Sequence, residues 1–287
     1  MKNQLSNDLI INNIKGEQIM TENFTIETVR KKLFDAYKNY DDALADKFKN
    51  SGFEKDETHY SRPYYCGVPD DWCNPNAIRI MIVGKEGEGS WNSDKYKDEW
   101  ANATITKMQE WNLDYTGVQL EQKTVDNIAF DSISKFWQRF RKIYKELNKE
   151  KPALCIWNEC DKIHRDSSSL EKNEKCALSA RDRTSLHKIK IDGQGILSKE
   201  IKILQPDIVI FFGWYGQAIN NDQPDILKKL YPENKWSSST FRNDFNCIYT
   251  NKEKELTVIA TYHPRYKNSD EYTNRIVQAI KKNMPVK

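Results

Sequence analysis

Four short polar segments of this sequence contain side chains suited to binding or catalysis, and each follows a run of apolar residues. They supply carboxylates, an amide that both donates and accepts hydrogen bonds, a glycine-rich backbone and an imidazole. The segments are Gly84-Lys85-Glu86-Gly87-Glu88-Gly89, Asn158-Glu159, Gly213-Trp214 and Thr261-Tyr262-His263-Pro264-Arg265. If the apolar runs are parallel strands of one sheet, these groups meet at one edge, because ligands bind outside the carboxyl ends of such strands.

Each segment taken alone also has a plain structural explanation. A single loop glutamate such as Glu86 is most often a solvent-exposed acid. An asparagine at a strand end, such as Asn158, is usually a turn or cap residue. A histidine before a proline, such as His263, is usually a structural hydrogen-bonding group. The glycine run fits neither a P-loop nor a dinucleotide-binding fingerprint. The combination at four strand ends is what indicates a functional site.

Apolar periodicity predicts the elements that position these segments. Short apolar runs predict strands at 78–83, 153–157, 208–212, 246–249 and 256–261. Helical spacing predicts helices at 26–48, within 90–123, and at 128–147, 196–204, 215–230 and 272–282. Strands alternating with helices imply an α/β three-layer sandwich, with a mostly parallel central sheet of about four strands flanked by helices. We predict a loose arm at 1–24 and a single domain at 25–287, with insertions near 90–123 and 159–194.

Composition places the chain among water-soluble proteins. Hydrophobic residues make up 38%, charged residues 30%, and the mean hydropathy is -0.82. No apolar run reaches the roughly 18 residues that span a bilayer, and residues 1–10 lack a signal-peptide pattern, so we expect a cytoplasmic protein. The net charge of +3 indicates no particular partner. The basic clusters at 139–142 and 188–190, taken singly, are interpreted as solvated faces.

Six cysteines raise the question of a metal centre. They are Cys66, Cys73, Cys155, Cys160, Cys176 and Cys247. Disulfides are not expected in a cytoplasmic chain. Four thiolates can hold an iron–sulfur cluster, but the sequence has no CxxC pair and the spacings fit such a cluster poorly. We therefore predict no metal and no cofactor, with ordinary buried or free thiols.

The order of four motifs resembles that of the uracil-DNA glycosylase superfamily. The motifs are IMIVGKEGEG, ALCIWNE, ILSKEIKILQPDIVIFFG and VIATYHPR, and the resemblance covers roughly residues 76–285. That superfamily has a water-activating loop after its first strand, an asparagine at the end of its second, and a histidine–proline motif before the loop that enters DNA. The resemblance implies a uracil-DNA glycosylase-like fold and a monofunctional DNA N-glycosylase. Such an enzyme acts on DNA in base excision, and we expect a monomer.

The resemblance also implies a role for individual residues. Glu86 takes the water-activating position, His263 bonds the leaving base, and Asn158 pairs with the edge of a flipped pyrimidine. Trp91 is the candidate to stack on that base. The other implied base-pocket residues are Glu88, Gly84 and Gly87, and the implied DNA-contacting residues are Pro264, Arg265, Tyr266, Lys85 and Gly213.

One departure from the family bears on the substrate. The uracil-specific branch has Asp-Pro-Tyr where this chain has Glu86-Gly87-Glu88. The tyrosine that closes that pocket against groups on the pyrimidine C5 atom is replaced by Glu88. We therefore hypothesise a wider pocket for a C5-modified pyrimidine, such as a hydroxymethylated or glucosylated cytosine of phage DNA, with Glu88 bonding to hydroxyl groups of the modification.

Three other interpretations stay open at this point. They are a catalytically inactive protein of the same fold that binds nucleic acid or a nucleotide, a nucleotide- or dinucleotide-dependent enzyme, and a uracil repair enzyme. The glycine run favours the second, but it lacks the GxGxxG order, and Glu159 lies far beyond the spacing of about 20 residues expected of a ribose-binding acid. DNA repair and anti-phage defence are both compatible with the motifs.

Overall fold

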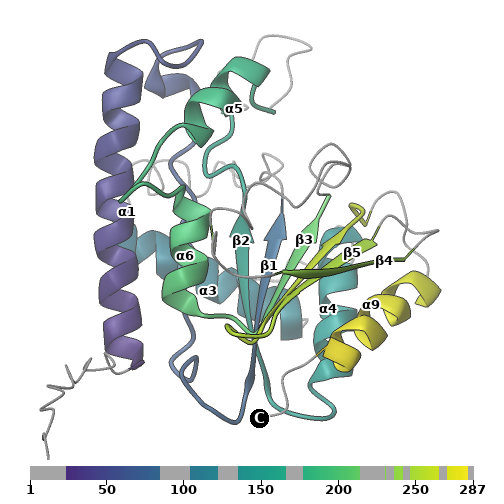
Figure 1. Ribbon diagram of the computed structural model, residues 1–287. Helices are drawn as coiled ribbons and strands as arrows, with labels where there is room; N and C mark the ends of the chain where they lie inside the picture. The colour runs from purple at the N-terminus through teal and green to yellow at the C-terminus, as the bar shows by residue number, and fades with distance from the viewer. Residues whose placement is uncertain are drawn as a thin grey trace, which may run out of the picture.

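The protein is an α/β sandwich built on one central sheet (Figure 1). The structure is a computed structural model and describes residues 24–84, 104–121, 135–165, 177–213, 230, 236–241, 246–264 and 270–283. In chain order its elements are α1 (Ile26–Lys49), η1 (Glu57–His59), β1 (Ile78–Gly84), α3 (Ile105–Glu121), α4 (Lys135–Leu147), β2 (Ala153–Glu159), α5 (Ala180–His187), α6 (Ile196–Leu204), β3 (Ile208–Phe212), β4 (Ser237–Phe241), β5 (Asn246–Asn251), β6 (Leu256–Thr261) and α9 (Asp270–Asn283).

The six strands have the order β2-β1-β3-β6-β5-β4. The first four run parallel, whereas β5 is antiparallel to β6 and β4 is antiparallel to β5. Val83 lies beside Asn158 and Phe211, and Phe211 lies beside Ala260. The carboxyl ends of the four parallel strands are therefore level with one another.

Helices cover both faces of this sheet. Along β1, Ile80 and Ile82 point to one face and Met81 and Val83 to the other, and all four are buried. The Met81 face packs against α1 and α6 in one hydrophobic core. The Ile80 face packs against α4 and α9 in a second core, and Figure 1 shows these two helices together on that side. The predicted mostly parallel sheet flanked by helices is thus confirmed, and the described residues form six strands where about four were expected.

Most predicted elements are present, and three of the described elements were not predicted: the short η1, β4 and α5. The strands beginning at Ile78, Ala153, Ile208, Asn246 and Leu256 are all present, as are the helices α1, α3, α4, α6 and α9. Sequence periodicity missed β4 and α5, and the latter lies inside the segment 159–194 that was expected to be an insertion. The prediction for 215–230 falls, apart from Leu230, outside the described residues.

The amino edge of the sheet is held by one buried acid. Asp207, directly before β3, accepts a hydrogen bond from the backbone N–H of Arg79 at 2.8 Å and forms an ion pair with the Arg79 guanidinium at 3.0 Å. Its backbone also bonds to Arg79 in β1 and to Thr257 in β6. This arrangement fixes the start of three neighbouring strands and therefore the level at which they end. Within the described part of the chain, no helix combines the length and the apolar character needed to cross a membrane.

The second core gives a test of the packing. Phe140 of α4 is completely buried, whereas Phe34 of α1 is 40% exposed. Phe140→Ala removes the same atoms as Phe34→Ala but leaves a cavity, so we expect it to lower the free energy of unfolding by about 3 to 5 kcal/mol. Urea denaturation measures both variants. Equal effects at the two positions would contradict the burial of α4 against the sheet.

Candidate functional site

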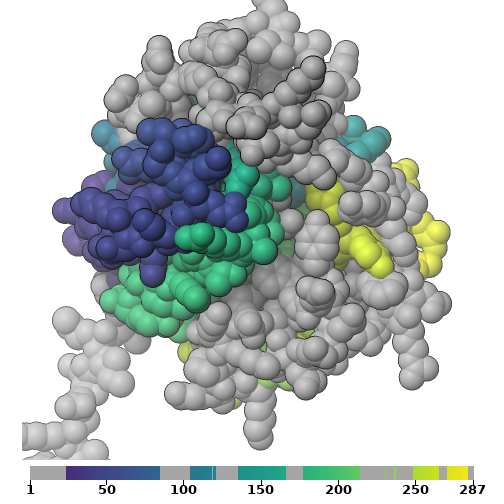
Figure 2. Space-filling model, turned by 90° about the horizontal axis from the view of Figure 1, so that it is seen from above, coloured from purple at the N-terminus to yellow at the C-terminus, as the bar shows by residue number. Residues whose placement is uncertain are grey.

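The carboxyl edge of the sheet brings together residues that are far apart in the sequence. Gly84 ends β1 and is the register partner of Glu159, which ends β2. Gly213 follows β3 and donates its backbone N–H to the carbonyl oxygen of Thr261 at 3.0 Å. His263 follows two residues after Thr261. The four predicted strand ends therefore lie along one edge, which faces the viewer in Figure 2.

His263 is held in place by a glycine. Gly213 has a φ of +80°, which L-residues rarely adopt, and a Cβ atom at that position would lie 3.2 Å from Cβ and 3.3 Å from Cδ2 of His263. The imidazole side chain therefore packs directly against the backbone at the end of β3. His263 is partly exposed, and Pro264 after it is buried. The contact fixes the ring at the outer edge of the sheet.

A buried carboxylate lies beside the end of β1. A Cβ atom on Gly84 would lie 2.6 Å and 2.8 Å from the two carboxylate oxygens of Glu159, so a larger residue there would displace the carboxylate. Glu159 is 4% exposed. Its carboxylate thus lies beside Gly84, the last residue of β1. The sequence places Glu159 among the residues of this edge, but the predicted site assigns it no catalytic or binding role.

Asn158 points away from that edge and into a buried polar network. Its side-chain nitrogen donates to Glu200 at 3.0 Å, and its oxygen accepts from the backbone N–H of Glu159 at 2.8 Å and from the Lys162 ammonium. Asn158 is 0% exposed. The amide implied to read a base is therefore engaged by internal partners in this structure, on the face that packs against α6.

The same network contains a completely buried ion pair. Lys162 and Glu200 lie 2.7 Å apart, and both side chains are 0% exposed. The Tyr37 hydroxyl donates to Glu200 at 2.7 Å and lies 2.9 Å from the Cys66 sulfur. The network thereby connects α1, the segment before β1, the end of β2 and α6. Several hydrogen bonds accompany these charges, which is the condition for a tolerable buried ion pair.

Four of the described cysteines, Cys66, Cys73, Cys155 and Cys160, form no disulfide. Burial raises the pKa of Cys66 to about 12, with a further contribution from the nearby charge of Glu200. Burial also raises the pKa of Cys155 well above its usual value. Both are therefore protonated at neutral pH, and thiolates are what metals bind. Among the residues that the structure describes, no three His, Cys, Asp or Glu side chains are grouped as a metal site.

The predicted site residues divide into two groups. The structure describes Gly84, Asn158, Gly213, His263 and Pro264, and of these Gly213 and His263 are in direct contact. The remaining predicted residues, whose roles stay predictions, lie outside the described residues: Lys85, Glu86, Gly87, Glu88, Trp91, Arg265 and Tyr266.

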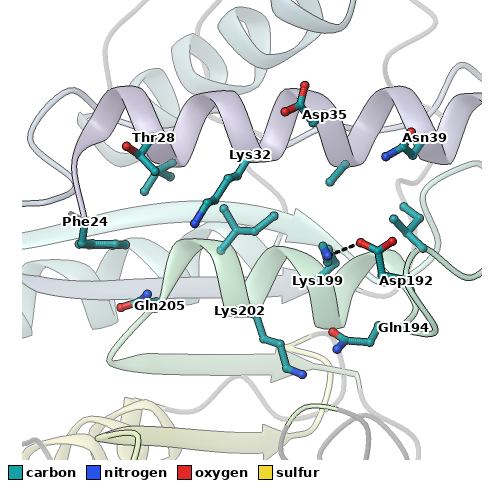
Figure 3. Close-up of a pocket in the computed structure, with 14 residues that line it drawn as sticks. Phe24, Thr28, Lys32, Asp35, Asn39, Asp192, Gln194, Lys199, Lys202 and Gln205 are labelled. Carbon is teal, nitrogen blue, oxygen red and sulfur yellow. Dashed lines mark hydrogen bonds and ion pairs between the residues drawn. The ribbon is translucent and has the colours of Figure 1, made fainter. Parts of the chain in front are cut away.

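A separate cavity of about 470 Å³ lies between α1 and α6. Figure 3 shows Lys32 extending from α1 toward α6, and Lys199 joined to Asp192 by an ion pair of 2.6 Å. Its walls also include Phe24 and Ile203. This cavity lies in the helical layer and contains none of the predicted site residues.

No protein-family model matches this chain, and no curated protein is similar to it in sequence. The resemblance to the uracil-DNA glycosylase superfamily therefore stays a prediction that rests on the order of the short motifs in the sequence.

The buried ion pair gives a test of the network. Lys162→Met leaves the Glu200 carboxylate buried without its cation, and we expect a loss of about 3 to 5 kcal/mol in the free energy of unfolding. The double variant K162M/E200Q removes both charges and should lose less. Lys31→Met, in the exposed pair with Asp35, is the control and should change little. A Lys162→Met protein as stable as the wild type in urea would contradict the network.

The contact between Gly213 and His263 gives a second test. Gly193 has a similar φ of +76°, but a Cβ atom on Gly193 would meet nothing within 4 Å. Gly193→Ala therefore measures the cost of the backbone conformation alone, about 1 to 2 kcal/mol. We expect Gly213→Ala to cost more than Gly193→Ala and to shift the imidazole resonances of His263 in NMR spectra. Unchanged His263 resonances would show that the glycine does not position the ring.

Proposed function

We propose that this protein is a DNA glycosylase that flips a pyrimidine out of DNA and hydrolyses its N-glycosidic bond, leaving an abasic site. The observation that carries the proposal is the convergence of four strand ends on one edge, with His263 fixed against Gly213. The motif order described above supports the same function. In the proposed reaction water is the nucleophile, and side chains of the protein supply the acid–base and electrostatic roles.

The proposed chemistry divides between two side chains. Cleavage of the bond builds positive charge on the deoxyribose and negative charge on the departing base. Glu86 is assigned to orient water and stabilise the sugar cation, and His263 to donate a hydrogen bond to the leaving base. His263 lies at the outer edge, and its ring packs against the backbone of Gly213. This suits a hydrogen-bond donor that must already be in place when negative charge develops on the departing base.

The base-reading role of Asn158 carries a structural condition. Its amide must exchange the internal bonds to Glu200 and Lys162 for a base edge, because its oxygen already accepts two hydrogen bonds. Without that exchange, Asn158 positions the end of β2 and other groups read the base. The wide-pocket hypothesis, in which Glu88 faces a C5 modification, concerns residues outside the described ones and is independent of this condition.

A second candidate function follows from the same observation. If Asn158 keeps its hydrogen bonds to Glu200 and Lys162 at all times, it cannot read a base. The protein would then bind nucleic acid or a nucleotide at this edge without catalysis. The two candidates differ in turnover and agree in binding, so one variant separates them.

Glu86→Gln is that variant. It keeps the size of the side chain and removes the charge, and we expect abasic-site formation to fall by about 10²-fold or more, as for loss of a general base, while DNA binding is retained. A gel assay for abasic sites on duplexes with uracil, 5-hydroxymethylcytosine or glucosylated cytosine measures this. Glu253→Gln, exposed at the opposite edge, is the control.

The same assay contains the outcomes that count against the proposal. Absence of abasic sites on every duplex, with DNA binding intact, would favour the non-catalytic candidate. Cleavage of uracil-containing DNA alone would leave the glycosylase intact and defeat the wide-pocket hypothesis.

A further inference from the structure

The segment containing α5 is unusually basic. Between residues 177 and 191 it has four Lys or Arg residues and one histidine, against a single acid. That acid, Asp182, is buried and 0% exposed. Its carboxylate accepts hydrogen bonds from the Tyr60 hydroxyl at 2.9 Å and the Glu54 backbone N–H at 2.8 Å, and it pairs with Arg165 at 3.5 Å. The negative charge of the segment is therefore turned inward and already compensated.

A second buried acid fixes α5 to the end of β2. Asp161, two residues after β2 and with a side chain 2% exposed, accepts from Arg183 Nε at 2.8 Å and lies 3.0 Å from His187 Nε2. Arg183 and His187 both belong to α5, and Asp161 is close in sequence to Glu159 of the carboxyl edge. Figure 1 accordingly shows α5 above the carboxyl ends of the strands, next to the end of α1.

The other cations of this segment are on its outer side. Arg181, Lys188 and Lys190 are exposed. Arg181 donates to the carbonyl oxygen of Ser51 at 3.0 Å, and Lys190 donates to that of His187 at 2.7 Å. We call Arg181, Lys188 and Lys190 the basic face.

We propose that the basic face binds the phosphodiester backbone of DNA beside the candidate site. Duplex DNA presents about one phosphate per 1.7 Å of helix axis, and exposed Lys and Arg are the groups that neutralise it. The segment made of α5 and the residues after it has its one acid, Asp182, buried, and Asp161 joins it to the end of β2. It therefore presents three exposed cations near the edge where the strand ends meet. The choice of DNA as the ligand rests on the proposed function.

The salt dependence of DNA binding tests the basic face. Each lost phosphate contact should lower the slope of log K against log salt by about 0.9 on duplex DNA. We expect the triple variant R181Q/K188Q/K190Q to have a slope smaller by about 2 to 3 than the wild type, measured by fluorescence anisotropy with a duplex of about 25 base pairs. The control is K145Q/K149Q/K151Q, which removes three exposed charges near the start of β2, at the opposite edge, and should leave the slope unchanged. Matching melting temperatures establish that all three proteins are folded.

Two outcomes would refute DNA binding by the basic face. One is an unchanged salt slope in the triple variant. The other is an equal decrease of the salt slope in the control variant, which would indicate a general charge effect. The gel assay for abasic sites on the same wild-type protein separates this result from the proposed function. A reduced salt slope in the triple variant without abasic sites supports DNA binding by the basic face and refutes catalysis. Abasic sites with an unchanged salt slope support catalysis and refute DNA binding by the basic face.

Discussion

The parallel alignment of β2, β1, β3 and β6 is the constraint on which the candidate site depends. Because these strands run in the same direction and end level with one another, the residues after each strand meet at one edge. Hydrophobic layers on both faces maintain the register, since a slip of one residue would move Ile82 and Val83 to the wrong layers. Asp207 adds a polar constraint at the amino edge. The scaffold of the site is thus set by burial and charge at places distant from the site itself.

The end of β2 illustrates how adjacent residues serve different layers. Side chains alternate along a strand, so Asn158 joins the network of Lys162 and Glu200 on the face covered by α6, while Glu159 reaches the end of β1. The buried ion pair would be costly alone and is tolerated because Asn158 and Tyr37 supply hydrogen bonds. Hydrogen bonds and packing beneath the ends of the strands therefore hold the groups of this edge in place. Such an arrangement suits the proposed site, in which a ligand would approach the carboxyl ends of the strands.

Strong apolar patterns made much of this fold predictable. The runs that form β1, β2, β3 and β6 are buried along nearly their whole length, which is the pattern of a parallel sheet. The strand Ser237–Phe241 contains three serines and no apolar alternation, and it is a strand because β5 pairs with it. The helix α5 buries only Asp182 and Leu186, so no apolar stripe marks it. Both elements depend on tertiary contacts that a local pattern does not contain.

The candidate site was predictable to the same extent. Strand ends could be located, and with them Gly84, Gly213 and His263. The partners of Asn158 could not, because Lys162 and Glu200 meet it only once α6 packs on the sheet. Likewise, the sequence alone favours a solvated face at 188–190, since nothing in it indicates that Asp161 and Asp182 are buried beneath.

A crystal structure with DNA containing an abasic site tests the central claim most directly. We expect the extruded deoxyribose to lie at the carboxyl edge of the sheet, with the Glu86 carboxylate near its anomeric carbon and the His263 ring on the side of the missing base. DNA bound elsewhere, or an extruded sugar with Glu86 and His263 pointing into separate regions, would contradict a glycosylase site at this edge.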